Sequence, residues 1–177
     1  MKKMIAIAMA ALCLAGCDDV PSAETVTTVS STLGASAAMV VKLAKVDQAV
    51  IDNINEVLKV VDKVVPDKDQ SFVDAWTPVI NEEVEKLVQK GKINGAQAKL
   101  VKLGLNAAAK GLDLLFEKKK EWKKYDQVVV GSISGFIAGY QSVLCPDCCV
   151  DCTVRSNPPT PDPDAVKLIA RHVGVEV

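Results

Sequence analysis

Aromatic residues and histidine are scarce in this chain. Its 177 residues include only two tryptophans, two tyrosines and three phenylalanines, and the single histidine is His172. We expect His172 to be a partly exposed residue at a helix end rather than a ligand or a base. No pair of carboxylates stands in a recognisable catalytic arrangement. The sequence therefore gives no catalytic residue, cofactor or small-molecule substrate, and we expect a protein that is not an enzyme.

An excess of positive charge is also missing. Lysine and arginine number 21 against 22 aspartates and glutamates, which gives a formal net charge of −1. Nucleic-acid-binding domains usually carry a basic surplus. The composition therefore gives no reason to expect nucleic acid as a partner.

The first residues have the three parts of an export signal. Met1-Lys2-Lys3 is basic, the run from Met4 to Leu14 is apolar but too short to span a membrane, and small residues follow. Leu14-Ala15-Gly16-Cys17 resembles the lipobox of bacterial lipoproteins. The resemblance implies that residues 1–16 are a signal peptide and that Cys17 becomes the lipidated first residue, a site of palmitate attachment.

The same resemblance implies a location. Lipoproteins of this class are held at the outer face of a bacterial membrane, since several acyl chains at ~0.8 kcal/mol per buried CH₂ exceed the weak binding of one chain. In Gram-negative members an aspartate after the cysteine tends to retain the protein in the inner membrane, and here Asp18 and Asp19 follow Cys17. We expect the periplasmic face of the inner membrane, or the outer membrane or cell surface if the host sorts differently.

Apolar residues recur in steps of three and four between Leu33 and Val64. That spacing puts them on one face of a helix, and Pro66 cannot continue a helix. The pattern therefore predicts a helix over residues 33–65.

Capping residues mark the next helices. Ser71 is suited to cap a short helical piece, and Thr77 followed by Pro78 has the order of an N-cap and a first helical residue. We expect Gly91 to end that helix and Asn94 to cap the one after it.

The segment Glu117–Lys124 reads EKKKEWKK. It fits either a solvated stretch of helix or a basic, tryptophan-containing patch lying on anionic lipid headgroups. The helix that Asn94 caps either continues through this segment or turns at Tyr125-Asp126, with Asp126 as the cap.

Gly131, Gly135 and Gly139 recur every fourth residue in an uncharged segment. Such spacing lets helices approach closely, both in lipid and in water. A single membrane crossing here would reverse the positive-inside preference. We therefore predict that the three glycines pack against the helix of residues 33–65 or the helix that Asn94 caps.

Cys145, Cys148, Cys149 and Cys152 place four thiols within eight residues. In an oxidising periplasm we expect two disulfides. The connectivity stays open, although a Cys148–Cys149 bridge is least favoured because it strains the backbone. A four-cysteine zinc or iron–sulfur site is the first alternative, and a redox-active C-x-x-C pair is the second.

We expect an all-α fold: a helical bundle of about four helices with a Cys/Pro-rich C-terminal tail. The expected divisions are a signal peptide (1–16), a lipid-anchored tether (17–22), the bundle (23–144) and a tail (145–177). The tail contains the cysteine cluster, a proline-rich linker and a short terminal helix, which Asp162-Pro163 starts and Gly174 ends.

The function that these features favour is non-enzymatic. We expect a membrane-anchored periplasmic lipoprotein that presents helical surfaces to an unknown envelope protein. Small lipoproteins of phages and mobile elements that exclude a second infection are one class of this size and location. The alternative is a membrane-perturbing protein working through the Gly131, Gly135 and Gly139 segment. A metal-binding or redox role of the cysteine cluster is the third hypothesis.

Overall fold

A computed structural model describes residues 21–145 and 159–176 of the chain. In these two ranges every regular element is helical, which confirms the all-α prediction. The elements in chain order are α2 (Ala23–Leu43), α3 (Gln48–Val61), α4 (Phe72–Gln89), α5 (Gly95–Lys118), the 3₁₀ helix η1 (Lys120–Lys124), α6 (Asp126–Leu144) and α7 (Pro163–Val173).

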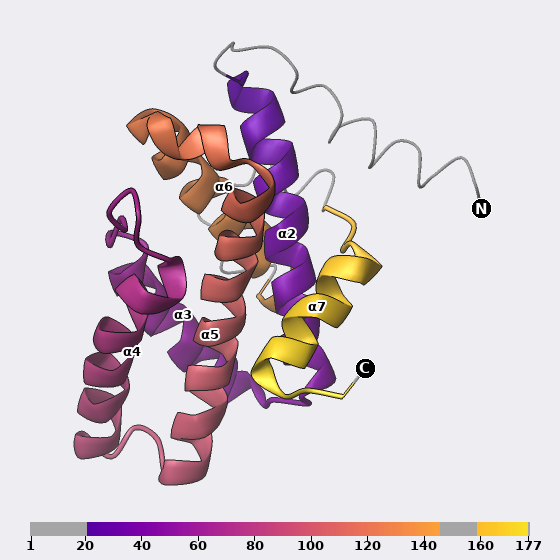
Figure 1. Ribbon diagram of the computed structural model, residues 1–177. Coiled ribbons are helices and arrows are strands. Elements are labelled where there is room, and N and C mark those ends of the chain that lie inside the picture. The colour runs from indigo at the N-terminus through magenta and orange to yellow at the C-terminus, as the bar shows by residue number, and fades with distance from the viewer. Residues whose placement is uncertain (1–20, 146–158, 177) are drawn as a thin grey trace.

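The helices pack around α2 and α5. Figure 1 shows α5 between α4 on one side and α2 and α7 on the other. α2 makes its most extensive contact with α6 and also contacts α5 and α7. α2 and α6 run parallel, because Val26 lies beside Gly131 and, further along both helices, Ser31 lies beside Gly139. Six α-helices therefore stand in the described ranges, where we had expected a bundle of about four.

The predicted single helix over residues 33–65 is wrong. α2 already begins at Ala23, with the Ser22 hydroxyl accepting from the Thr25 N–H, and it ends at Leu43. Lys45 then adopts a left-handed φ of 52°. Asp47 caps α3 by accepting from the Val50 N–H at 2.8 Å. The apolar spacing continues across the break because both helices bury a face, so spacing alone did not reveal it.

The helix start predicted at Thr77-Pro78 is also wrong. α4 runs through Pro78, and Ser71, the expected cap of a short piece, caps the whole helix by accepting from the Asp74 N–H at 3.0 Å. The Thr77 hydroxyl donates to the Val73 carbonyl at 2.6 Å instead of capping. An interior proline removes one helical hydrogen bond. Packing offsets that loss, since the buried residues on both sides of Pro78 share one face: Phe72, Ala75, Trp76, Ile80, Val84 and Leu87.

The capping predictions for Gly91 and Asn94 are confirmed. Gly91, at φ 66°, ends α4 in a Schellman motif, in which its N–H donates to the Val88 carbonyl and the Lys92 N–H donates to the Leu87 carbonyl. Asn94 caps α5 in a reciprocal capping box with Gln97.

The terminal helix is confirmed as well, and it belongs to the packed core. Asp162 caps α7, Pro163 is its first residue, and Gly174 ends it at φ 76°. Ile169 and Ala170 are fully buried. α7 therefore packs on α2 and α5.

Candidate functional site

Most of the chemically distinctive residues of the sequence lie outside the described ranges. These are Cys17, Asp18, Asp19, Cys148, Cys149 and Cys152. Cys145 is described: it follows the last residue of α6 and is buried. In residues 21–145 and 159–176 no group of three His, Cys, Asp or Glu side chains could hold a metal, but this does not test a site that needs the other three cysteines.

The three glycines of α6 pack against α2, at Val26, Thr27, Ser30 and Ser31. These contacts all precede Leu33, so the predicted close packing occurs, but not on the predicted helix of residues 33–65. A methyl group added at Gly139 would overlap the backbone carbonyl of Ser31. A methyl group added at Gly135 would overlap the hydroxyl of Ser30. The two backbones therefore approach to a distance that only glycine permits.

α2 contributes a glycine to the same contact. A methyl group added at Gly34 would overlap the carbonyl oxygen of Phe136. We call this contact the α2–α6 seam, formed by Ser30, Ser31 and Gly34 of α2 with Gly135 and Gly139 of α6. The sequence search found the glycines of α6 by their spacing, but the partner glycine, Gly34, has no such repeat.

α2 and α6 are also the two described helices that are long and apolar enough to cross a membrane. By length and composition alone this is weak evidence, because core helices of water-soluble proteins pass the same test. Half or more of each apolar stretch is buried against other parts of the protein.

The lysine-rich segment is not one solvated helix, and its tryptophan does not face lipid. α5 ends at Lys118, and η1 then turns the chain into α6. Trp122 is only 3% exposed, and the Lys119 amine lies 5.9 Å from the centre of its ring. The helix capped by Asn94 therefore ends at Lys118, before the expected turn at Tyr125-Asp126, and Tyr125 rather than Asp126 is at the cap position of α6. The aromatic ring that one of the two interpretations placed on headgroups belongs to the core.

The turn at η1 places several of its lysines around a groove of about 660 Å³. We call it the basic groove. Its lining comes from the segment before and at the start of α4, from α5, from η1 and from the end of α7: Lys68, Asp69, Ser71, Val73, Lys110, Asp113, Phe116, Glu117, Lys120, Lys123, Lys124 and His172. His172 is exposed in the last turn of α7, as expected for a residue at a helix end.

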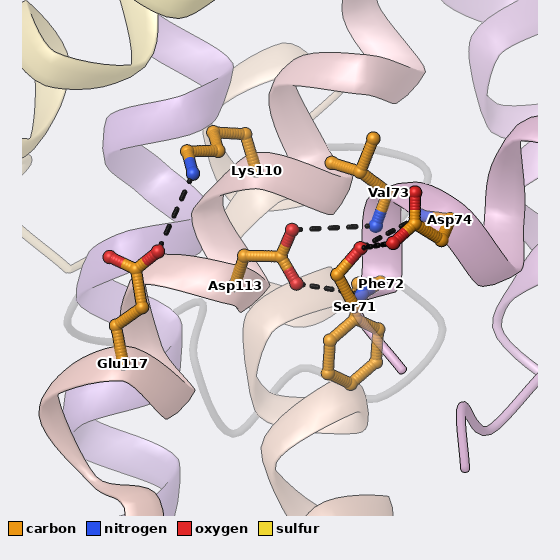
Figure 2. Close-up of polar contacts among 7 residues, drawn as sticks. All are labelled: Ser71, Phe72, Val73, Asp74, Lys110, Asp113 and Glu117. Carbon is orange, nitrogen blue, oxygen red and sulfur yellow. Dashed lines mark hydrogen bonds and ion pairs between the residues drawn. The ribbon is translucent and has the colours of Figure 1, made fainter. Parts of the chain in front are cut away.

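Asp113 is the most buried carboxylate of the basic groove, and it links α5 to α4. Its two oxygens accept from the Phe72 N–H at 2.6 Å and the Val73 N–H at 3.4 Å, as Figure 2 shows. Burial raises the pKa of the Asp113 carboxyl, while these two hydrogen bonds and the nearby Lys110 and Lys123 act in the opposite direction. Asp113 therefore serves as a second cap for the start of α4.

Two of the groove lysines are already engaged. The Lys110 amine lies 3.6 Å from a carboxylate oxygen of Glu117 (Figure 2), and the Lys123 amine donates to the Gln70 carbonyl at 3.1 Å. Three other groove lysines are Lys68, Lys120 and Lys124. Their side-chain amines have no ion-pair or hydrogen-bond partner among the described residues. This arrangement can attract an anion. Its most buried carboxylate, Asp113, is committed to backbone donors.

Sequence reasoning found Lys120, Lys123, Lys124 and His172 as separate features but did not bring them together.

Comparisons with protein-family models, with curated proteins and with solved structures find no match to this chain.

Proposed function

We propose that the chain is a non-enzymatic lipoprotein, anchored through acylated Cys17 at the periplasmic face of the inner membrane. In this proposal its helical domain presents a surface to another envelope protein, as an exclusion or immunity protein would. The lipobox Leu14-Ala15-Gly16-Cys17 supports the anchor, and Asp18 and Asp19 support the choice of membrane.

The α2–α6 seam is the observation that carries the choice of an interaction module over a membrane-perturbing protein. The two helices with the composition of membrane spans bury much of their surface against each other, and α2 also packs against α5 and α7. Insertion of α6 alone would break backbone contacts at Gly139 and Gly34 that no lipid can replace. The seam therefore favours a folded domain outside the bilayer.

We further propose that the Cys/Pro-rich segment joins α6 to α7 as a tail clamped by two disulfides. Two described positions support this. Cys145 is buried at the end of α6, and the Asp162 N–H at the start of α7 donates to the Ser36 hydroxyl of α2 at 2.8 Å. Both ends of the segment are thus attached to the same packed body.

Metabolic labelling with palmitate tests the anchor. We expect label on the wild-type chain and none on Cys17→Ser, which should accumulate as the unprocessed precursor. Changing Asp18 and Asp19 to serine should shift the labelled protein toward the outer membrane in a Gram-negative host, with the unchanged protein as control. Label that persists on Cys17→Ser would refute the lipoprotein proposal.

Crosslinking in intact membranes tests the interaction role. We expect the anchored wild-type chain to yield a defined envelope protein, and a variant unfolded at the seam, Gly139→Leu, to lose it. If the wild-type chain permeabilised membranes and Gly139→Leu did not, the result would instead favour the membrane-perturbing alternative.

A further inference from the structure

Unpaired lysines from separate segments face the basic groove. Lys68 comes from the segment between α3 and α4, and Lys120 and Lys124 come from η1. All three residues are exposed, and their side-chain amines have no ion-pair or hydrogen-bond partner in the described part of the chain. Each ammonium therefore has three donors available to a ligand.

The carboxylates of the groove do not cancel this charge. Five lysines line the groove against three carboxylates. Asp113 is committed to the start of α4 and Glu117 to Lys110, which leaves Asp69 as the one lining carboxylate without a described partner.

The shape of the groove indicates the size of its ligand. Its volume of about 660 Å³ exceeds the volume of a single inorganic anion. Val73 and Phe116 add an apolar part to the lining. Lysine ammonium groups act as mobile point charges that suit phosphate. We propose that the basic groove binds the phosphate group of a small phosphate ester, with the organic part lying toward Val73 and Phe116.

Two sources could supply this chemistry: a free glycerol phosphate or the glycerol phosphate headgroup of an anionic lipid. The proposal does not depend on the lipid anchor. An anchor at Cys17 would nevertheless place the basic groove near a membrane. η1 leads directly into the start of α6, and the start of α6 lies beside the start of α2. The η1 lysines are thus at the end of the domain from which the chain leads back to Cys17.

Lysine footprinting of the purified full chain in an uncharged detergent tests the site. Acetylation of each lysine is measured by mass spectrometry with and without glycerol phosphate, and with sodium chloride at equal ionic strength. We expect glycerol phosphate to slow acetylation of Lys68, Lys120 and Lys124. Lys42, Lys90 and Lys99 are the internal controls, because they are exposed and lie outside the groove lining.

A second arm replaces the soluble ligand with vesicles of phosphatidylglycerol or of phosphatidylcholine, whose headgroup carries no net charge. Protection by glycerol phosphate alone assigns a free ester, protection by phosphatidylglycerol alone assigns a headgroup, and protection by both assigns the shared phosphate chemistry. Protection by neither, or equal slowing at Lys42, Lys90 and Lys99, overturns the proposal.

Charge variants supply the matched control. Changing Lys68, Lys120 and Lys124 together to glutamine should weaken the apparent affinity about tenfold or more, whereas the same change at Lys42, Lys90 and Lys99 should leave it unchanged. Circular dichroism checks that both variants stay folded. An equal loss of affinity in both variants would show that only net charge matters, and it would overturn the proposed site. The soluble arm needs no membrane, so a chain without lipid on Cys17 would refute the anchor and leave this test standing.

Discussion

The carbonyl of Ser31 in α2 lies directly against Gly139 in α6, with no room for a methyl group between the two helices. Packing holds both backbones in place, since the sequence neighbours Ser30 (beside Ser31) and Tyr140 (beside Gly139) are fully buried. A clash here cannot be relieved by rotating a side chain, so the seam should respond sharply to added volume.

Gly139→Ala should destabilise the fold by about 3 kcal/mol or more, because the helices must separate to admit the methyl group. Gly135→Ala should cost less, since the Ser30 hydroxyl that it meets can rotate. Chemical unfolding followed by circular dichroism measures both.

Gly131→Ala is the control on the same helix. The nearest atom to its added methyl would be Cγ1 of Val26 at 3.7 Å, an ordinary contact, and alanine is a better helix former by up to ~1 kcal/mol. We expect equal or higher stability. A loss at Gly131 as large as at Gly139 would mean that helix propensity or sequence spacing, and not close approach, explains the glycines.

Asp113 should make stability depend on pH. Burial raises the pKa of its carboxyl in the folded state, so its contribution is fully present below the unfolded pKa and is lost as the pH rises through the higher folded pKa. The free energy of unfolding of the wild type, minus that of Asp113→Asn, should therefore fall as the pH rises from the unfolded pKa of about 4 through the higher folded pKa. Asn cannot ionise, so the difference isolates Asp113 from Asp62, whose pKa burial also raises. A difference that grows with pH would contradict this assignment.

Asn55 should be a site where an apolar replacement stabilises the protein. It is 6% exposed on α3, and its amide oxygen and nitrogen have no hydrogen-bond partner among the described residues. Burying such a group unpaired costs ~1–3 kcal/mol. We expect Asn55→Leu to raise the melting temperature. Asn53→Leu, on the same helix, is the control: the Asn53 amide donates to the Ala49 carbonyl at 2.6 Å, and no gain is expected there.

The cysteine cluster should contain no free thiol in protein purified from the periplasm. Thiol titration before and after reduction should show Cys145, Cys148, Cys149 and Cys152 all oxidised. Reduction should lower stability only modestly, since a loop of this length contributes about 2 kcal/mol in the chain-entropy model. Stoichiometric zinc in protein purified without added metal would support the four-cysteine metal site instead.

Signals that act within a few residues were readable from the sequence. Asn94 with Gln97, Gly91 after α4, and Gly174 after α7 are local solutions to the unpaired groups at helix ends, and each occurs as expected. The apolar spacing likewise indicated helical structure, although it missed the part of α2 before Leu33 and did not indicate η1. Such features depend on backbone geometry over one or two turns, which neighbouring residues control.

Tertiary structure decided what local preference leaves open. Pro78 looked like a helix start, but the shared buried face of Trp76 and Ile80 keeps α4 continuous. The apolar residues that recur from Leu33 to Val64 looked like the face of one helix. Instead α2 and α3 are separate helices, and each buries part of this set. At Pro78 the free energy of burying a face outweighs local preference, whereas between α2 and α3 the continuous apolar spacing hid the break at Lys45.

The basic groove has the same origin. Lys68, Lys120 and His172 are far apart in sequence, and only the packing of α4, η1 and α7 around α5 brings them to one surface. The sequence by itself indicated the all-helical character of the described ranges, most of their capping residues, the glycine repeat and a stretch that resembles a lipobox. Which helices meet, how closely they meet and which charges then face each other follow from long-range packing, which no window of neighbouring residues contains.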